Sequence, residues 1–168
     1  MRIVLVLDNI RSCYNVGAIL RTAEGFGIEK VVLSGYTPRV HNEKLLPHLR
    51  EKLDGEIHKT ALGAEDMLEI DGSDDIRADL EEYRADGWRI VGLENNIKDE
   101  RLKKINECKF SEDEKIVLVL GEEVEGINRS LFDLFDLFLE IPMVGQKESF
   151  NVSVAAGIAM FALRYYNL

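Results

Sequence analysis

Short runs of apolar, mostly β-branched residues recur along the chain and alternate with stretches of helical character. These runs cover residues 3–7, 30–33, 88–93, 116–120 and 137–143. Strands that are apolar on both faces and separated by helices form parallel sheets that are covered on both sides. The alternation therefore predicts an α/β protein, with a parallel sheet and helices on both of its faces.

Helices are expected between and after these strands, at residues 16–26, 42–53, 74–85, 128–135 and 151–166. No internal repeat, low-complexity tract or Pro- and Gly-rich linker divides the chain. With 168 residues and 46% hydrophobic content, the sequence is long enough for one core and too short for two comfortable domains. We expect a single domain over residues 1–168.

The last expected helix is apolar almost all round, and a helix without a polar face must be covered on more than one side. Burial between the sheet and a neighbouring helix is one explanation. A subunit interface is the other, since the small residues Ala155, Ala156, Gly157 and Ala159 would let a second helix approach closely. The sequence leaves both open.

The net charge of −10 argues against nucleic-acid binding, because affinity for a phosphate backbone comes largely from Lys and Arg. The acidic residues, however, concentrate between residues 60 and 140, and the first third of the chain is slightly basic. This part contains Arg11, Arg21, Arg39, His41, Lys44, His48, Arg50 and Lys52. These residues form either an RNA-facing surface or ordinary solvated surface.

Two cysteines, Cys13 and Cys108, stand far apart and provide neither a disulfide framework nor a metal-ligand spacing. We expect no metal. The apolar run at the N-terminus is stopped by Asp8, and the run from Val154 to Leu163 is about half a membrane span. A cytoplasmic protein without a signal peptide or membrane span is expected.

Three segments carry polar side chains in a distinctive order. Residues 15–21 read NVGAILR, residues 118–126 read LVLGEEVEG, and residues 141–156 read IPMVGQKESFNVSVAA. Alone, Ser149 or Asn151 in the third segment would simply cap the last helix. Together, the segments resemble the motifs of the SpoU (TrmH-like) branch of the SPOUT RNA methyltransferases. The resemblance covers nearly the whole chain and is closest to the short, single-domain members.

The resemblance implies a fold and an activity. It implies a deep trefoil knot in the C-terminal region and an obligate homodimer. The expected activity is 2′-O-methylation of ribose in tRNA or rRNA with S-adenosylmethionine. By the same resemblance, the cofactor-binding residues are Leu93, Gly121, Ile141, Met143 and Phe150. No Gly-x-Gly-x-x-Gly follows the first strand, which argues against a dinucleotide-binding fold.

The family pattern places catalytic function on Asn15, Arg21, Glu123, Ser149 and Asn151. A guanidinium with a pKa above about 12 is a poor proton acceptor. We therefore favour a role for Arg21 in binding the acceptor phosphate and stabilising the developing alkoxide, and base function would need a neighbour that disfavours its charge. Two positions depart from the family pattern: Glu122 replaces the commoner Asn or Ser, and Phe150 replaces Leu.

Two other hypotheses compete with this one. The first is a catalytically silent, knotted RNA-binding or assembly dimer, which would be expected to lose some of the motif residues that this chain retains. The second is a flavodoxin-like domain, which would need a phosphate-binding loop after its first strand. Residues 11–15 lack the glycines of such a loop.

Overall fold

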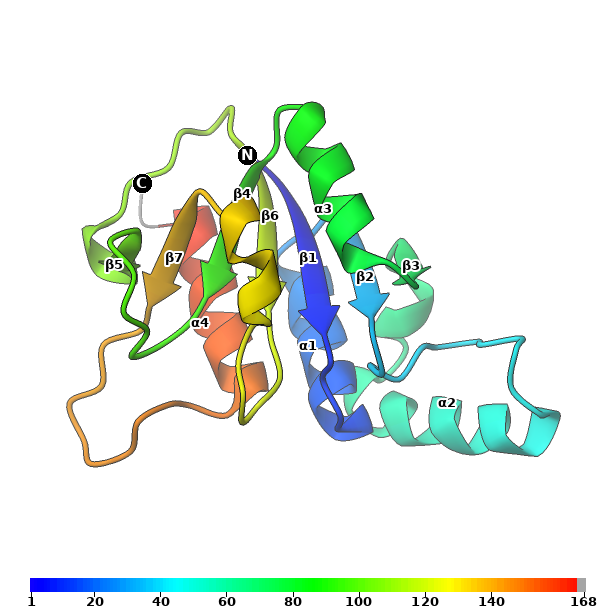
Figure 1. Ribbon diagram of the computed structural model, residues 1–168. Coiled ribbons are helices and arrows are strands. Elements are labelled where there is room, and N and C mark those ends of the chain that lie inside the picture. Colours follow the sequence, from blue (N-terminus) through cyan, green and yellow to red (C-terminus); the bar gives the residue numbers. More distant parts are fainter. Residues whose placement is uncertain (166–168) are drawn as a thin grey trace.

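The computed structural model describes residues 1–165 and consists of one sheet between two layers of helices (Figure 1). The strands are β1 (Arg2–Asp8), β2 (Lys30–Ser34), β3 (Ile70–Ser73), β4 (Arg89–Leu93), β5 (Leu102–Lys104), β6 (Lys115–Leu120) and β7 (Leu137–Glu140). The α-helices are α1 (Cys13–Gly25), α2 (Pro47–Ala61), α3 (Ile76–Ala85) and α4 (Val152–Tyr165). Three short 3₁₀ helices are η1 (Ala64–Asp66), η2 (Ile105–Glu107) and η3 (Arg129–Leu134).

The seven strands form a sheet in the order β3-β2-β1-β6-β4-β7-β5, and every neighbouring pair is parallel. At its centre, β1 pairs with β6 from Arg2 opposite Lys115 to Leu7 opposite Leu120. The predicted parallel α/β sheet is confirmed. Because all strands run the same way, their carboxyl ends and the loops that follow them share one edge, at the bottom of Figure 1.

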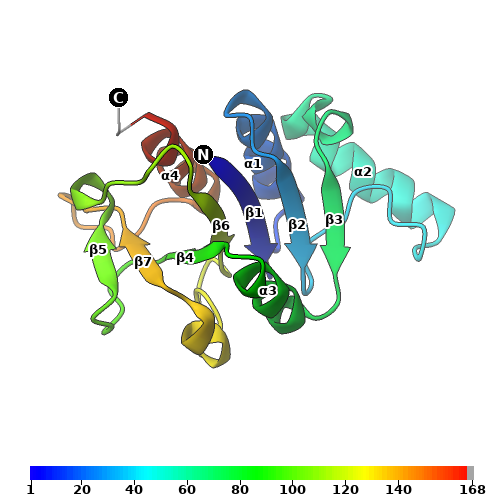
Figure 2. The same ribbon diagram turned by 90° about the horizontal axis from the view of Figure 1, so that it is seen from above.

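Each face of the sheet buries its own apolar core, because successive side chains of a strand point to opposite faces. On β1, Ile3, Leu5 and Leu7 face the layer that contains α1, α2 and α4. Val4 and Val6 face the layer of α3 and η3. Figure 2 shows the two layers on opposite sides of the sheet, which confirms that helices cover both faces.

The glycine of the first motif is required by helix packing. A Cβ atom at Gly17 would lie far inside contact distance of the Ile57 carbonyl and the Thr60 hydroxyl of α2. The absence of a side chain lets α1 and α2 approach closely, and the Thr60 hydroxyl donates a 2.9 Å hydrogen bond to the Tyr14 carbonyl. The close contact with α2 that Gly17 permits therefore helps to hold the first turn of α1, which contains Asn15.

Several boundaries differ from the sequence-based expectation. The helix expected at 42–53 is α2, which begins at Pro47 because proline keeps the preceding Leu46 extended (φ −59°, ψ 142°). The strand expected at 137–143 ends at Glu140, and the helix expected at 128–135 is the 3₁₀ helix η3. Of the helix expected at 151–166, residue 166 lies outside the described residues. The edge strands β3 and β5 were not predicted.

Helix α4 is covered on one side only. Ala156, Ala159 and Met160 are buried against the sheet and α1, which confirms burial as one reason for the apolar sequence. Val154, Phe161 and Tyr165 on the same helix are 49%, 47% and 46% exposed. The single chain therefore leaves an apolar surface on α4, and the subunit interface stays a prediction.

Candidate active site

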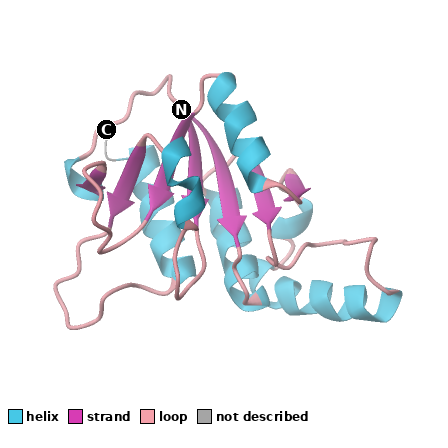
Figure 3. Cartoon of the chain, viewed as in Figure 1, coloured by secondary structure: helices cyan, strands magenta, loops and turns pink. Residues whose placement is uncertain are grey.

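A cavity of about 450 Å³ opens at the carboxyl edge of the sheet, where β4, β6 and β7 end. Ligands of open α/β sheets bind at this edge, in the crevice between the loops that follow the carboxyl ends of the strands. The lining comes from three stretches: residues 93–96 at the end of β4, residues 120–124 with Gly126 at the end of β6, and Ile141 with residues 148–152 and Ala155 before and in α4. In Figure 3 the long loop that leads from β7 to α4 runs below this edge.

The loop after β6 folds back on itself immediately beyond Gly121. Glu122 and Gly126 exchange two backbone hydrogen bonds of 3.1 and 3.0 Å. A Cβ atom at Gly121 would overlap the backbone of Gly126 and Ile127. The glycine is therefore needed by the return of its own loop, rather than by the close approach of a ligand alone. Gly126, which also lines the cavity, has φ +71° and closes the turn.

Two side chains directly after β4, which sequence reasoning missed, bind the loops that follow β6 and β7. The Glu94 carboxylate accepts the backbone N–H of Ile127, and burial raises its pKa, while its bonds to backbone N–H groups oppose the rise. The Asn95 amide donates to the Ile141 carbonyl at 3.0 Å and accepts the Ile141 N–H at 3.2 Å. In the sequence, the only indication of these two residues is that they are polar and directly follow an apolar strand.

Asn15 joins the three motifs. Its Nδ2 donates to Glu123 Oε1 at 3.2 Å, and its Oδ1 accepts Asn151 Nδ2 at 3.2 Å. Asn151 also accepts the Ser153 N–H at 2.9 Å, so it caps the first turn of α4 as well. Glu123 and Asn151 line the cavity, and Asn15 fixes both from α1.

The remaining predicted residues divide into two groups. Leu93, Gly121, Ile141, Ser149 and Phe150 line the cavity with Glu123 and Asn151. Met143 lies half-buried in the loop after β7, outside the lining that the described residues form. Arg21 is exposed on α1 and is also outside it, and within residues 1–165 its side chain makes no hydrogen bond or ion pair.

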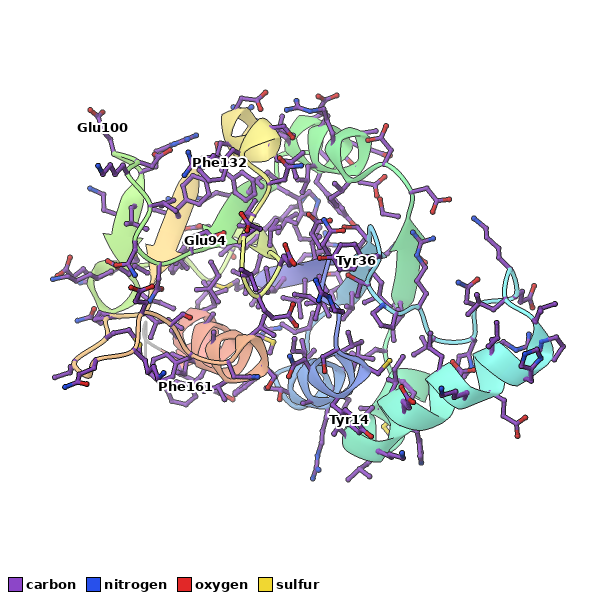
Figure 4. All side chains as sticks on the ribbon, turned by 60° about the horizontal axis from the view of Figure 1, so that its bottom comes forward. Tyr14, Tyr36, Glu94, Glu100, Phe132 and Phe161 are labelled. Carbon is purple, nitrogen blue, oxygen red and sulfur yellow. The ribbon has the colours of Figure 1, made fainter. Side chains whose placement is uncertain are left out.

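The site is strongly acidic. Glu94, Glu122, Glu123 and Glu148 line the cavity, and no Lys or Arg of the described part of the chain does. At the rim, the Arg11 guanidinium lies 3.3 Å from the Glu122 carboxylate. A cationic ligand is favoured in such a cavity, and a phosphate group is not. Figure 4 shows Glu94 and Tyr36 on either side of the loop that follows β6.

The described part of the chain contains neither a metal centre nor a membrane-spanning helix. Within residues 1–165, no three His, Cys, Asp or Glu side chains are grouped closely enough to hold a metal ion. The helices of this part of the chain are also too short or too polar to cross a membrane.

A parallel α/β sheet with a cavity in its strand-end loops is typical of domains that bind a small ligand at that edge, and comparison with known proteins identifies the family. The SpoU rRNA Methylase family matches residues 2–161, and the chain belongs to this family. Its sequence is 33% identical over 159 residues to the 23S rRNA (guanosine-2′-O-)-methyltransferase RlmB of Nitrosomonas europaea. That match covers 95% of this chain and 54% of the relative.

Solved structures show the same fold. A TrmH-family protein from Porphyromonas gingivalis superposes with a TM-score of 0.80 at 26% identity, covering 97% of this chain and 59% of that one. The SpoU methyltransferase AviRb from Streptomyces viridochromogenes, in complex with AdoMet, has a TM-score of 0.76 at 20% identity, covering 96% and 56%. The chain spans little more than half the length of the curated relatives that it matches.

Proposed function

We propose that the chain is the catalytic domain of an S-adenosylmethionine-dependent RNA ribose 2′-O-methyltransferase, which works as a homodimer on tRNA or rRNA in the cytoplasm. The observation that carries the proposal is the pair of hydrogen bonds by which Asn15 joins Glu123 and Asn151 at the cavity. The name of the Nitrosomonas relative, a guanosine-2′-O-methyltransferase, supports the ribose as the acceptor.

The size and the charge of the cavity suit S-adenosylmethionine. Its volume of about 450 Å³ lies in the range of small-molecule sites. Leu93, Ile141 and Phe150 offer apolar walls for a flat ring, and the acidic lining suits a ligand with a net positive charge. When bound, this cofactor supplies a methyl group activated by a sulfonium. Leu93, Gly121, Ile141 and Phe150 would hold it, with Met143 from the same loop as Ile141.

Positioning is the main task of the protein, because aligning two reactants can contribute roughly 7–11 kcal/mol. Asn15 orients Glu123 and Asn151, and Ser149 lines the same cavity. We assign these four polar residues to orienting the acceptor ribose. Arg21 binds the acceptor phosphate and stabilises the negative charge that develops on the 2′-oxygen.

The homodimer gives Arg21 access to an acceptor. Arg21 is exposed on α1, which packs against α4, and α4 carries exposed apolar side chains. Covering this surface with a second copy would remove apolar area from water. We expect Arg21 to reach the acceptor at the pocket of the other subunit. Membership of the family further supports a deep trefoil knot in the C-terminal region.

The test is methyl transfer by purified protein. The substrates are S-adenosylmethionine with a radioactive methyl group and total RNA from a strain that lacks the gene. We expect 2′-O-methyl nucleosides in the digested product, and no incorporation when the target nucleotide is 2′-deoxy. Calorimetry should show cofactor binding without RNA. Methyl groups on a base would overturn the ribose assignment, and RNA binding without transfer would indicate the silent dimer.

A further inference from the structure

A half-exposed tyrosine stands on a rigid turn beside the cavity. Tyr36 follows β2, and the residue is 52% exposed. Its backbone N–H donates to Asn9 Oδ1 at 3.2 Å, and the preceding Gly35 has φ +60°. The following Thr37 is buried, and its hydroxyl donates to the Leu7 carbonyl at 2.8 Å. The turn therefore fixes the backbone of a residue whose aromatic ring faces solvent.

The ring lies near the rim of the cavity. Desolvation, and after it the nearby carboxylate of Glu122, which lines the cavity, raise the pKa of the Tyr36 hydroxyl. The Arg11 guanidinium lies 3.3 Å from the same carboxylate, and its side chain is 78% exposed. Tyr36, Arg11 and Glu122 form what we call the rim cluster.

The rim cluster has the two features by which proteins hold single-stranded nucleic acid. Unstacked bases bind on aromatic rings, and phosphates bind to Arg. An acceptor chain that approaches the acidic cavity also needs a cation at the entrance, since its phosphates are repelled by the four glutamates. Arg11 supplies that charge, and its contact with the Glu122 carboxylate holds the guanidinium at the rim.

We propose that Tyr36 and Arg11 form a nucleotide subsite of the acceptor RNA, in which a base flanking the methylated nucleotide stacks on Tyr36 and its phosphate binds Arg11. The inference rests on the proposed function and names the part of the acceptor that this domain reads. Stacking is tolerant of base identity, because every base has a flat face. The subsite therefore selects unpaired RNA rather than a particular base.

The experiment compares Tyr36→Leu, Tyr36→Phe and Arg11→Gln, with Lys109→Gln as a charge control exposed far from the rim. The readouts are the KM for undermethylated total RNA and, by calorimetry, the Kd for S-adenosylmethionine. Tyr36→Leu should raise the KM roughly 5- to 100-fold, since it removes a stacking ring. Tyr36→Phe keeps the ring and should raise it less than about threefold. The cofactor Kd should not change in any of them.

Arg11→Gln should raise the KM as well and reduce the steepness of its salt dependence by about one phosphate contact. Equal KM values for the Leu and Phe variants would overturn the stacking subsite while leaving methyl transfer intact. If the wild-type protein transfers no methyl group, the binding of a labelled single-stranded RNA of about 12 nucleotides decides the inference instead. Tyr36→Leu must then weaken that binding, and unchanged anisotropy titrations would contradict the subsite.

Discussion

Asn15 accepts a hydrogen bond from Asn151 at 3.2 Å, although 136 residues separate the two in sequence. The same side chain donates to Glu123, so one amide on α1 orders side chains from two other loops. This bridge depends on an amide, because it uses a donor and an acceptor at the same time.

Asn15→Asp should therefore impair catalysis more than binding of the cofactor. The aspartate removes the donor to Glu123 and places a second carboxylate beside it. We expect kcat to fall at least about tenfold, which corresponds to one lost hydrogen bond plus repulsion. Steady-state kinetics with saturating cofactor would measure this. Asn106→Asp, an exposed position near the edge strand β5, is the matched control and should leave kcat unchanged.

Arg21→Ala should abolish methyl transfer without unfolding the protein, since the side chain is exposed. Loss of one group that stabilises developing charge costs about 100- to 1,000-fold in kcat. Arg21→Lys should recover little, because an ammonium cannot form a bidentate bond to phosphate. Turnover above a few per cent of wild type in the alanine variant would refute the assignment, and Arg129→Ala provides an exposed arginine for comparison.

Glu94→Gln should stabilise the fold at neutral pH and weaken cofactor binding. Burial raises the Glu94 pKa in the folded state, so ionisation there costs stability, and this cost appears as the pH rises from the unfolded pKa through the folded pKa. Below the unfolded pKa the two proteins should be equally stable. Urea unfolding at neutral and acid pH measures the difference. Glu100→Gln, which points into solvent in Figure 4, should show none.

Gly121→Ala should disturb the loop after β6. The added methyl group overlaps the backbone of Gly126 and Ile127, so the return of the loop must shift. A cost of about 1–3 kcal/mol in unfolding free energy is expected from such overpacking, together with loss of cofactor binding. Gly145→Ala tests the specificity of this result, since a Cβ atom there meets nothing within 4 Å. Thermal melts and calorimetry on both variants suffice.

Arg164→Ala should destabilise the domain without touching the cavity. Its guanidinium donates to the Phe26 and Met1 carbonyls at 2.8 Å each and also to the Gly27 carbonyl, which ties α4 to the end of α1 and to the N-terminus. Hydrogen bonds from a charged donor contribute about 1.5–3 kcal/mol each to the free energy of unfolding. In the variant, water that binds the freed carbonyl groups reduces this loss. Denaturant titration should show the loss, and an unchanged midpoint would contradict it.

Most of the sheet could be predicted because its central strands are apolar on both faces, as in residues 116–120 of β6. The edge strands do not meet this criterion. β3 reads Ile-Asp-Gly-Ser and β5 reads Leu-Lys-Lys. An edge strand has only one neighbour and exposes much of its surface, so it can carry polar residues. The helix expected at residues 42–53 begins before α2 does, because the helical pattern was followed across Pro47, where α2 starts.

Seven of the ten site residues predicted from the motifs line the cavity, namely Leu93, Gly121, Glu123, Ile141, Ser149, Phe150 and Asn151, and their roles stay a prediction. Motif order did not indicate Glu94 and Asn95, whose roles depend on which loops come to lie beside β4. Nor could it show that Arg21 lies away from its own cavity, because a helix position alone does not determine which surface a side chain faces.

The pairing of β1 with β6 has a consequence for how the protein is made. Strand β1 is synthesised early, but its neighbour β6, which begins at Lys115, is synthesised only after about two thirds of the chain. Contacts between distant parts of a sequence form slowly and leave apolar strand surface exposed while they wait. Until β6 is made, one edge of β1 therefore has no partner strand, and the apolar side chains of β1 lack part of the core that later covers them.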